Sequence, residues 1–268
     1  MDKQKLVRFI NKYYLNGTVN SVILNSSSSS QELSARFISG DKTLLGDLTM
    51  DKWNFEDSDI GVYNTEQLLK LLMVMDNDVN ASLTKSGEKA ISLKLTDRSS
   101  SINYMLSDTS VINEPPKMKT IPEFELSIDV TPQFISKFIS GKSALSEADN
   151  FTVITDGVDT KLVIGYATIN TNTVTIPVTT PKVSDIENVS FNANLFKEVL
   201  SANKECESAT LEISSQGLAK INFKVDDFTS TYWLVGTSEQ DWNLWHFKGN
   251  SKRDTKVFSK KDNKKVSL

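Results

Sequence analysis

The chain has 268 residues, of which 38% are hydrophobic, enough for one large globular domain or two of roughly 120 residues. Its formal net charge is −4, yet residues 246–268 carry eight Lys/Arg and two Asp, so the rest of the chain is acidic and bulk charge does not favour nucleic acid. No apolar run approaches the roughly 20 residues that cross a bilayer, no signal peptide is recognisable, and Cys206 cannot form an intramolecular disulfide. We therefore expect a cytoplasmic protein.

The first part of the chain alternates between helical and strand patterns. Helices are predicted where apolar residues recur every three or four positions, and strands where they alternate with polar ones. The predicted elements are a helix at 2–14, strands at 18–24 and 32–39 joined by a serine-rich loop at 26–30, a helix at 65–75, a strand at 79–84, and a strand containing Ile91, Leu93 and Leu95.

A proline-rich stretch at 107–123 separates this part from a second one, and we expect it to connect two domains. The helix predicted after it has Thr131 as N-cap, Pro132 in its first turn and Gly141 as its stop. In order, the second part is predicted to contain a strand at 124–130, a helix at 131–140, strands at 161–166 and 173–178, a helix at 193–203 and a strand at 229–235.

The two parts resemble each other. Residues 62–106 can be laid over 190–235, a displacement of about 129 residues, with a strand, a helix, a polar break and further strands in the same order. The predicted fold class is α+β, with two similar domains that each place two helices on antiparallel sheets through a βαβββ-like unit used four times. The expected boundaries are 1–110 for the first domain, 111–123 for the connector, 124–236 for the second domain and 237–268 for an aromatic and basic extension.

Catalytic groupings are missing from the sequence pattern. His246 is the one histidine, so neither a His-based triad nor a His-rich metal site can be assembled. Gly141-Lys142-Ser143 imitates the end of a phosphate-binding loop, but the first glycine of that motif is replaced by Ser136 inside a predicted helix. We expect no enzyme activity, no cofactor and no metal site.

All four predicted helices carry basic residues on the polar face. A lysine on a surface helix is ordinary taken singly, but the same placement on corresponding helices of an acidic chain favours contact with phosphates without base reading. The candidate DNA-binding residues are Lys5, Arg8, Lys12, Lys70, Lys137, Lys142, Lys197 and Lys204.

The doubled pattern resembles the sliding clamps of T-even-type tailed bacteriophages, a branch of the group that includes proliferating cell nuclear antigen. The stretches VYNTEQLLKLLMVMDNDVNASL, VTPQFISKFISGK and FNANLFKEVL carry the resemblance, which covers roughly residues 1–236. It implies the DNA-clamp fold, in which three subunits join head-to-tail around duplex DNA with the helices lining the hole. The eight basic residues would then face the hole.

The resemblance also implies partners and a place of action. A viral clamp tethers the DNA polymerase for processive replication, is loaded by a separate clamp-loader ATPase, can support late transcription factors, and acts in the cytoplasm of an infected bacterial host. Its partners dock short peptides near the connector and near the end of the last strand. Two alternatives stay open: a monomeric accessory DNA-binding protein, and a virion structural protein with duplicated domains. The extension, with Trp242, Trp245 and Phe247, is either a solvated tail or an addition that contacts a subunit edge, DNA or a partner.

Overall fold

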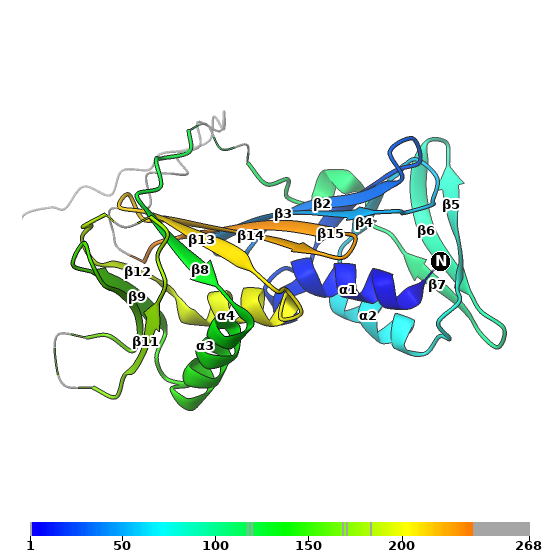
Figure 1. Ribbon diagram of the computed structural model, residues 1–268. Helices are drawn as coiled ribbons and strands as arrows, with labels where there is room; N and C mark the ends of the chain where they lie inside the picture. Colours follow the sequence, from blue (N-terminus) through cyan, green and yellow to red (C-terminus); the bar gives the residue numbers. More distant parts are fainter. Residues whose placement is uncertain are drawn as a thin grey trace, which may run out of the picture.

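A long antiparallel sheet, four helices on one side of it and a small sheet at each end make up the described part of the chain (Figure 1). The computed structural model describes residues 2–116, 118, 120–167, 169, 171–182 and 184–237. The helices are α1 (Lys3–Tyr14), α2 (Thr65–Met73), α3 (Pro132–Ala144) and α4 (Ala193–Ala202). Within these ranges, no helix combines the length and the apolar character that a bilayer crossing needs.

The central sheet has the strand order β4-β1-β2-β3-β15-β14-β13-β8, and the end sheets have the orders β11-β10-β9-β12 and β5-β6-β7. The strands are β1 (Val22–Ser27), β2 (Glu32–Ile38), β3 (Leu44–Asp51), β4 (Ser58–Val62), β5 (Asn80–Ser86), β6 (Lys89–Thr96), β7 (Ser101–Met105), β8 (Leu126–Val130), β9 (Asn150–Thr155), β10 (Thr160–Ile164), β11 (Val174–Val178), β12 (Val189–Asn192), β13 (Ala209–Ser214), β14 (Leu218–Val225) and β15 (Phe228–Val235).

The two halves of the chain are joined where β3 pairs with β15, with Gly46 opposite Tyr232. The ring of Phe37 lies over Gly46, where a Cβ atom would come within 2.1 Å of the ring. Phe37 also packs against Tyr232 and Tyr13, with ring centroids 6.0 and 6.2 Å apart. The hydrophobic core therefore runs without interruption from one half into the other.

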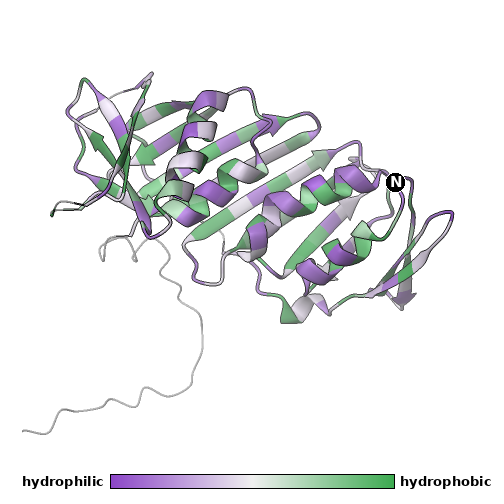
Figure 2. Ribbon diagram, turned by 90° about the horizontal axis from the view of Figure 1, so that it is seen from below, coloured by the Kyte–Doolittle hydropathy of each residue, from purple (hydrophilic) through white to green (hydrophobic). Residues whose placement is uncertain are grey.

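Each helix begins at a side chain that caps its first turn. Asp2, Asn64, Thr131 and Asn192 accept hydrogen bonds from backbone N–H groups that the helix itself leaves free. Each helix carries both hydrophobic and hydrophilic residues, as expected for amphipathic helices (Figure 2). The apolar side of each helix is buried in the core against the central sheet or the neighbouring small sheet.

The four helices and the α+β class are confirmed, and two local predictions are wrong. The strand expected at 18–24 is displaced to Val22–Ser27, because the chain leaves α1 through Leu15 in the left-handed region (φ 45°) and a 3₁₀ turn at Leu15–Gly17. Gly141 is not a helix stop, since α3 continues to Ala144. Its missing side chain instead lets α3 approach β11, because a Cβ would lie 2.9 Å from Cγ1 of Val174.

The βαβββ unit recurs, but its first copy is incomplete. Helices α2, α3 and α4 each follow one strand and precede three, whereas α1 is preceded in the described residues only by a bridge between Asp2 and Asp78. The domain boundaries stay a prediction. The extension at 237–268, with Trp242, Trp245 and Phe247, lies outside the described residues apart from Thr237.

The described residues between 112 and 125 run along the face of the central sheet that the helices leave open (Figure 1). Nη2 of Arg36 donates a hydrogen bond to the carbonyl oxygen of Pro116 at 2.9 Å. Met118 and Phe124 pack on a small apolar cluster, which is formed by Leu45, Leu218 and Trp233.

Candidate nucleic-acid interface

The side of the molecule that carries the four helices is the candidate interface. Much of its solvent-facing surface is amide and hydroxyl rather than charged. The exposed residues of this kind are Gln4, Asn11, Gln67, Gln133, Ser136, Ser140, Ser143 and Asn194. Such groups can hydrogen-bond to phosphate oxygens without the strong attraction of a dense cationic patch.

Four predicted cations lie at this surface on α2, α3, α4 and the turn after α4. Lys137 and Lys204 are exposed, and neither forms an ion pair with another described residue. Nζ of Lys70 pairs with Glu66 one helical turn earlier, and Nζ of Lys197 lies 3.7 Å from Oε1 of Glu198. Lys137 and Lys204 are therefore the cations most available to an external anion.

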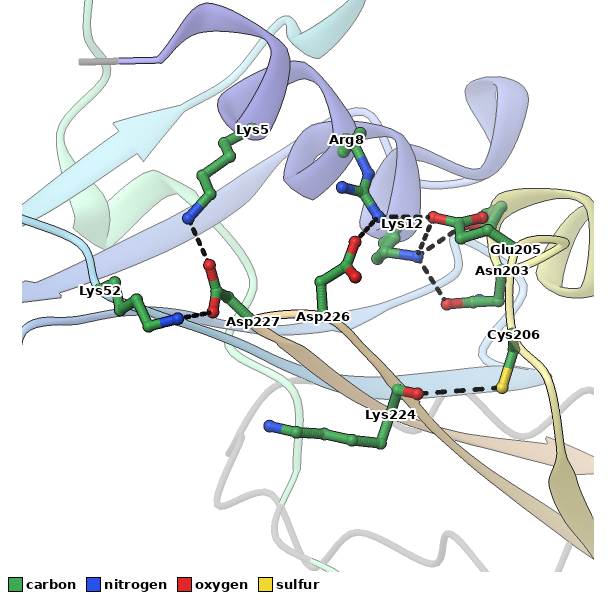
Figure 3. A network of polar contacts seen from close by, with 11 residues as sticks. Lys5, Arg8, Lys12, Lys52, Asn203, Glu205, Cys206, Lys224, Asp226 and Asp227 are labelled. Carbon is green, nitrogen blue, oxygen red and sulfur yellow. Dashed lines mark hydrogen bonds and ion pairs between the residues drawn. The ribbon is translucent and has the colours of Figure 1, made fainter.

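Two partly exposed cations of α1, Lys5 and Arg8, are held by carboxylates from the second half of the chain (Figure 3). Nη2 of Arg8 lies 2.8 Å from Oδ2 of Asp226 and 3.2 Å from Oε1 of Glu205. Lys5 pairs with Asp227, which also accepts a hydrogen bond from Nζ of Lys52 at 2.7 Å. The sequence predicted the cations but not these partners.

Hydrogen bonds from Lys5 and then Lys52 lower the pKa of Asp227 to about 2, from a usual value of 3.8. Because the folded pKa is depressed, this stabilising contribution is present above pH 3.8 and is lost as the pH falls through about 2. We predict that replacing Lys5 and Lys52 by Gln raises the pKa of Asp227 toward 3.8, as measured by NMR of the carboxyl carbon. An Asp227 signal that still titrates near pH 2 in the Gln variant would contradict the assignment of these two donors.

The interpretation of Lys12 as a solvent-facing cation is wrong. Its side chain is 1% exposed, and Nζ donates hydrogen bonds of 2.9 Å to the carbonyl oxygen of Ala202 and to Oδ1 of Asn203. Nζ also lies 3.3 Å from Oε1 of Glu205. Burial lowers the pKa of Lys12, and the attraction of Glu205 opposes that effect. Lys12 therefore caps the end of α4 and fastens it to α1.

Lys142 is also buried rather than exposed, with 3% of its surface accessible. Because α3 continues past Gly141, Lys142 lies within its last turn. Its Nζ donates to the carbonyl oxygens of Leu145 and Ser146 at 3.2 and 2.9 Å, which satisfies carbonyl groups at the end of the helix. Lys12 and Lys142, two of the eight predicted DNA-binding cations, thus cap the C-terminal ends of helices.

A polar groove of about 590 Å³ lies where the end of α1 meets α4, at the junction of the two halves. Residues of both signs line it, among them Arg8, Asn11, Glu198, Ser201, Lys204 and Glu205. Sequence reasoning missed Glu205, which lines the groove, and also Asp226 and Asp227, which pair with α1 beside it. All three are about 200 residues from α1 along the chain, and Asp226-Asp227 reads as an ordinary turn. The mixed charge of the groove is suited to weak contact with a polyanion.

Comparison with solved structures identifies the architecture. No protein-family profile matches the sequence, and no curated protein is similar to it at the sequence level. The proliferating cellular nuclear antigen of Entamoeba histolytica superimposes with a TM-score of 0.68 at 15% identity, over 89% of this chain and 97% of that one. The PCNA2–PCNA3 complex of Sulfolobus tokodaii gives a TM-score of 0.66 at 12% identity, over 88% and 97%. The chain therefore has the fold of the PCNA sliding clamps.

Proposed function

We propose that this chain is the subunit of a sliding clamp that encircles duplex DNA and tethers a DNA polymerase. The observation that carries the proposal is the match over nearly the whole chain to two PCNA structures. The four helices on one side of a continuous sheet support it, because in a ring they would form the inner wall. The sparse free cations, Lys137 and Lys204 above all, suit a surface that must hold DNA without gripping it.

The internal repeat supports a head-to-tail ring. In the chain, the third strand after α1 (β3) pairs with the third strand after α4 (β15). The corresponding strands after α3 and α2 are β11 and β7, and each is the edge strand of an end sheet. Pairing β7 of one subunit with β11 of the next would repeat the internal joint between subunits. If Tyr104 takes the place of Tyr232 and Val174 takes the place of Gly46, the register of β15 with β3 places Tyr104 opposite Val174 and Ile102 opposite Ile176.

The two ends of the chain complement each other in charge. Residues 80–106, which form the sheet with β7, contain four basic and two acidic residues. Residues 147–187, around the sheet with β11, contain two basic and six acidic residues. Large apolar side chains are exposed at each end as well, such as Met105 (65%) and Ile169 (73%). A heterologous interface needs such unlike ends, and three subunits are our proposal for ring closure.

The clamp role brings further partners. We propose that polymerase, the clamp-loader ATPase and late transcription factors dock near the connector, where Met118 and Phe124 cover the apolar cluster of Leu45, Leu218 and Trp233. The indole N–H of Trp233 is buried there without a hydrogen-bond acceptor among the described residues, so a docked peptide carbonyl would satisfy it. We place the protein in the cytoplasm of a bacterium infected by a phage.

Mass in solution and topology on DNA test the proposal. A trimer by native mass spectrometry, a ring by electron microscopy, and retention on circular but not linear duplex after loading are the expected results. A monomer that binds circular and linear DNA equally would favour an accessory DNA-binding protein instead. Incorporation into purified virions without polymerase stimulation would favour a structural protein.

Reversing the charge of the two free cations, Lys137 and Lys204, should impair the proposed clamp function. We expect Lys137→Glu with Lys204→Glu to reduce clamp-dependent polymerase stimulation about tenfold at moderate salt, because two phosphate contacts per subunit become repulsive. Lys42→Glu with Lys224→Glu is the control for net charge: Lys42 lies in the β2–β3 turn, and Lys224 lies on the sheet face away from the helices, where its Nζ is 3.5 Å from Oδ2 of Asp51. Equal loss in the control, or none in the test pair, would contradict the assignment of the helix face.

A further inference from the structure

The basic side of α1 is neutralised from within the chain. The three cations on this side, Lys5, Arg8 and Lys12, all have carboxylate partners, and every partner comes from the second half. The fourth cation of α1, Lys3, donates to the carbonyl oxygen of Met75 instead. The partners are Asp226 and Asp227 in the turn between β14 and β15, and Glu205 in the segment after α4 (Figure 3). Lys12 is buried, so Lys5 and Arg8 are the two that an external anion can approach.

The hairpin itself does not require these carboxylates. Asp226 has φ 51°, a left-handed conformation in which Gly or Asn is at least as well accommodated as Asp. The equivalent turn between β6 and β7 has Arg98 and Ser99 in the two central positions. Two consecutive carboxylates beside α1 are thus a property of the second hairpin, and turn geometry alone does not explain them.

We propose that Asp226, Asp227 and Glu205 act as an internal counter-charge that competes with DNA phosphates for Lys5, Arg8 and Lys52, and so keeps the affinity of the helix face for duplex DNA low. The proposal rests on the proposed function, because it takes the DNA to pass along the helices. In this proposal the three acidic residues set the affinity for duplex DNA without contacting the DNA themselves.

The physical basis is an exchange of one anion for another. The side chains of Lys5 and Arg8 are 34% and 37% exposed, so a phosphate can reach them, but it must first displace a carboxylate already in contact. The net gain from each such contact is therefore small. Lys137 and Lys204 have no carboxylate to give up within the described residues, so the resting contact with DNA falls to them. Few net contacts allow a protein to move along DNA with little resistance.

The test measures binding of a fluorescent 40-base-pair duplex by the full chain over a range of salt concentrations. Asp226→Asn with Asp227→Asn should bind about tenfold more tightly at low salt, and the slope of log K against log salt should steepen by about 0.9 for each cation released. Glu114→Gln with Glu123→Gln is the control, because these exposed connector residues give the same change in net charge on the side of the sheet away from the helices. Adding Lys5→Gln, Arg8→Gln and Lys52→Gln to the Asn variant should abolish the gain.

Each possible result either supports or overturns the counter-charge. A gain in the Asn variant alone, lost again with the three Gln substitutions, supports the counter-charge. An equal gain in the control overturns it in favour of net charge, and the absence of a gain overturns it outright. The same three Gln substitutions in the unmodified chain give a second test that does not depend on the hairpin: the salt slope should change by less than about 0.5. Native mass spectrometry of each variant separates the two proposals, since an intact ring without the gain contradicts the counter-charge only.

Discussion

Lys12→Met is expected to lower the free energy of unfolding by about 3 kcal/mol. Methionine keeps the apolar stem but removes the ammonium group, which leaves the carbonyl of Ala202 and Oδ1 of Asn203 without their donor from α1. Glu205 also loses one of its two cationic partners. Urea denaturation monitored by tryptophan fluorescence provides the measurement.

The control for this substitution is Lys137→Met, at an exposed position of α3. Lys137 is exposed and unpaired among the described residues, so its replacement should change the free energy of unfolding by no more than about 0.5 kcal/mol. The two substitutions should have the opposite ranking in their effect on DNA binding. Folded Lys12→Met should keep its affinity for duplex DNA, and Lys137→Met should lose part of that affinity. Equal stability of the two variants would show that the Lys12 contacts do not hold the halves together.

Asn103→Pro should break the proposed ring and leave the subunit folded. The N–H of Leu106 bonds to Ile91, so the alternation of an antiparallel ladder points the N–H of Asn103 away from β6, to the open edge of the sheet. Proline is tolerated at such an edge position within one chain. It would remove a ladder hydrogen bond to β11 of the next subunit and place a ring in its way, which should weaken subunit association about 100-fold.

The control is Asn103→Val, which keeps the N–H and favours a strand. We expect native mass spectrometry at micromolar concentration to find a monomer for the proline variant and the wild-type oligomer for the valine variant. Circular dichroism should show the same secondary structure for each. An unchanged oligomer in the proline variant would mean that β7 is not the joint.

The local patterns of the sequence were sufficient to predict the helices but not their surroundings. The spacing of Leu6, Phe9, Ile10 and Tyr13 predicts α1 and its buried side. The same spacing puts Lys12 on the polar side, and nothing in α1 reveals that the end of α4 covers it. A glycine at position 141 is typical of a helix end. Its role in the structure is to let α3 pack closely on Val174, in a strand 33 residues later. Contacts between distant segments decided each of these cases.

The candidate site was predictable in part for the same reason. Basic residues on corresponding helices were visible in the sequence, and Lys137 and Lys204 are exposed as expected. The carboxylates that hold Lys5 and Arg8 come from the other end of the chain, and a pair of Asp residues in a hairpin carries no sign of its partner. The internal repeat held more information than the local patterns, because it relates β7 and β11 to the pairing of β3 with β15.

The pairing of β3 with β15 also has a consequence for synthesis on the ribosome. β3 ends at Asp51, and β15, the last strand described, begins only at Phe228. At about 5–20 residues per second, the edge of β3 waits roughly ten to forty seconds for its partner. During that interval the nascent chain exposes an unpaired strand, which can pair with a non-native strand of the same chain or of another copy. The first half of this protein can complete its sheet only after nearly all of the second half has emerged.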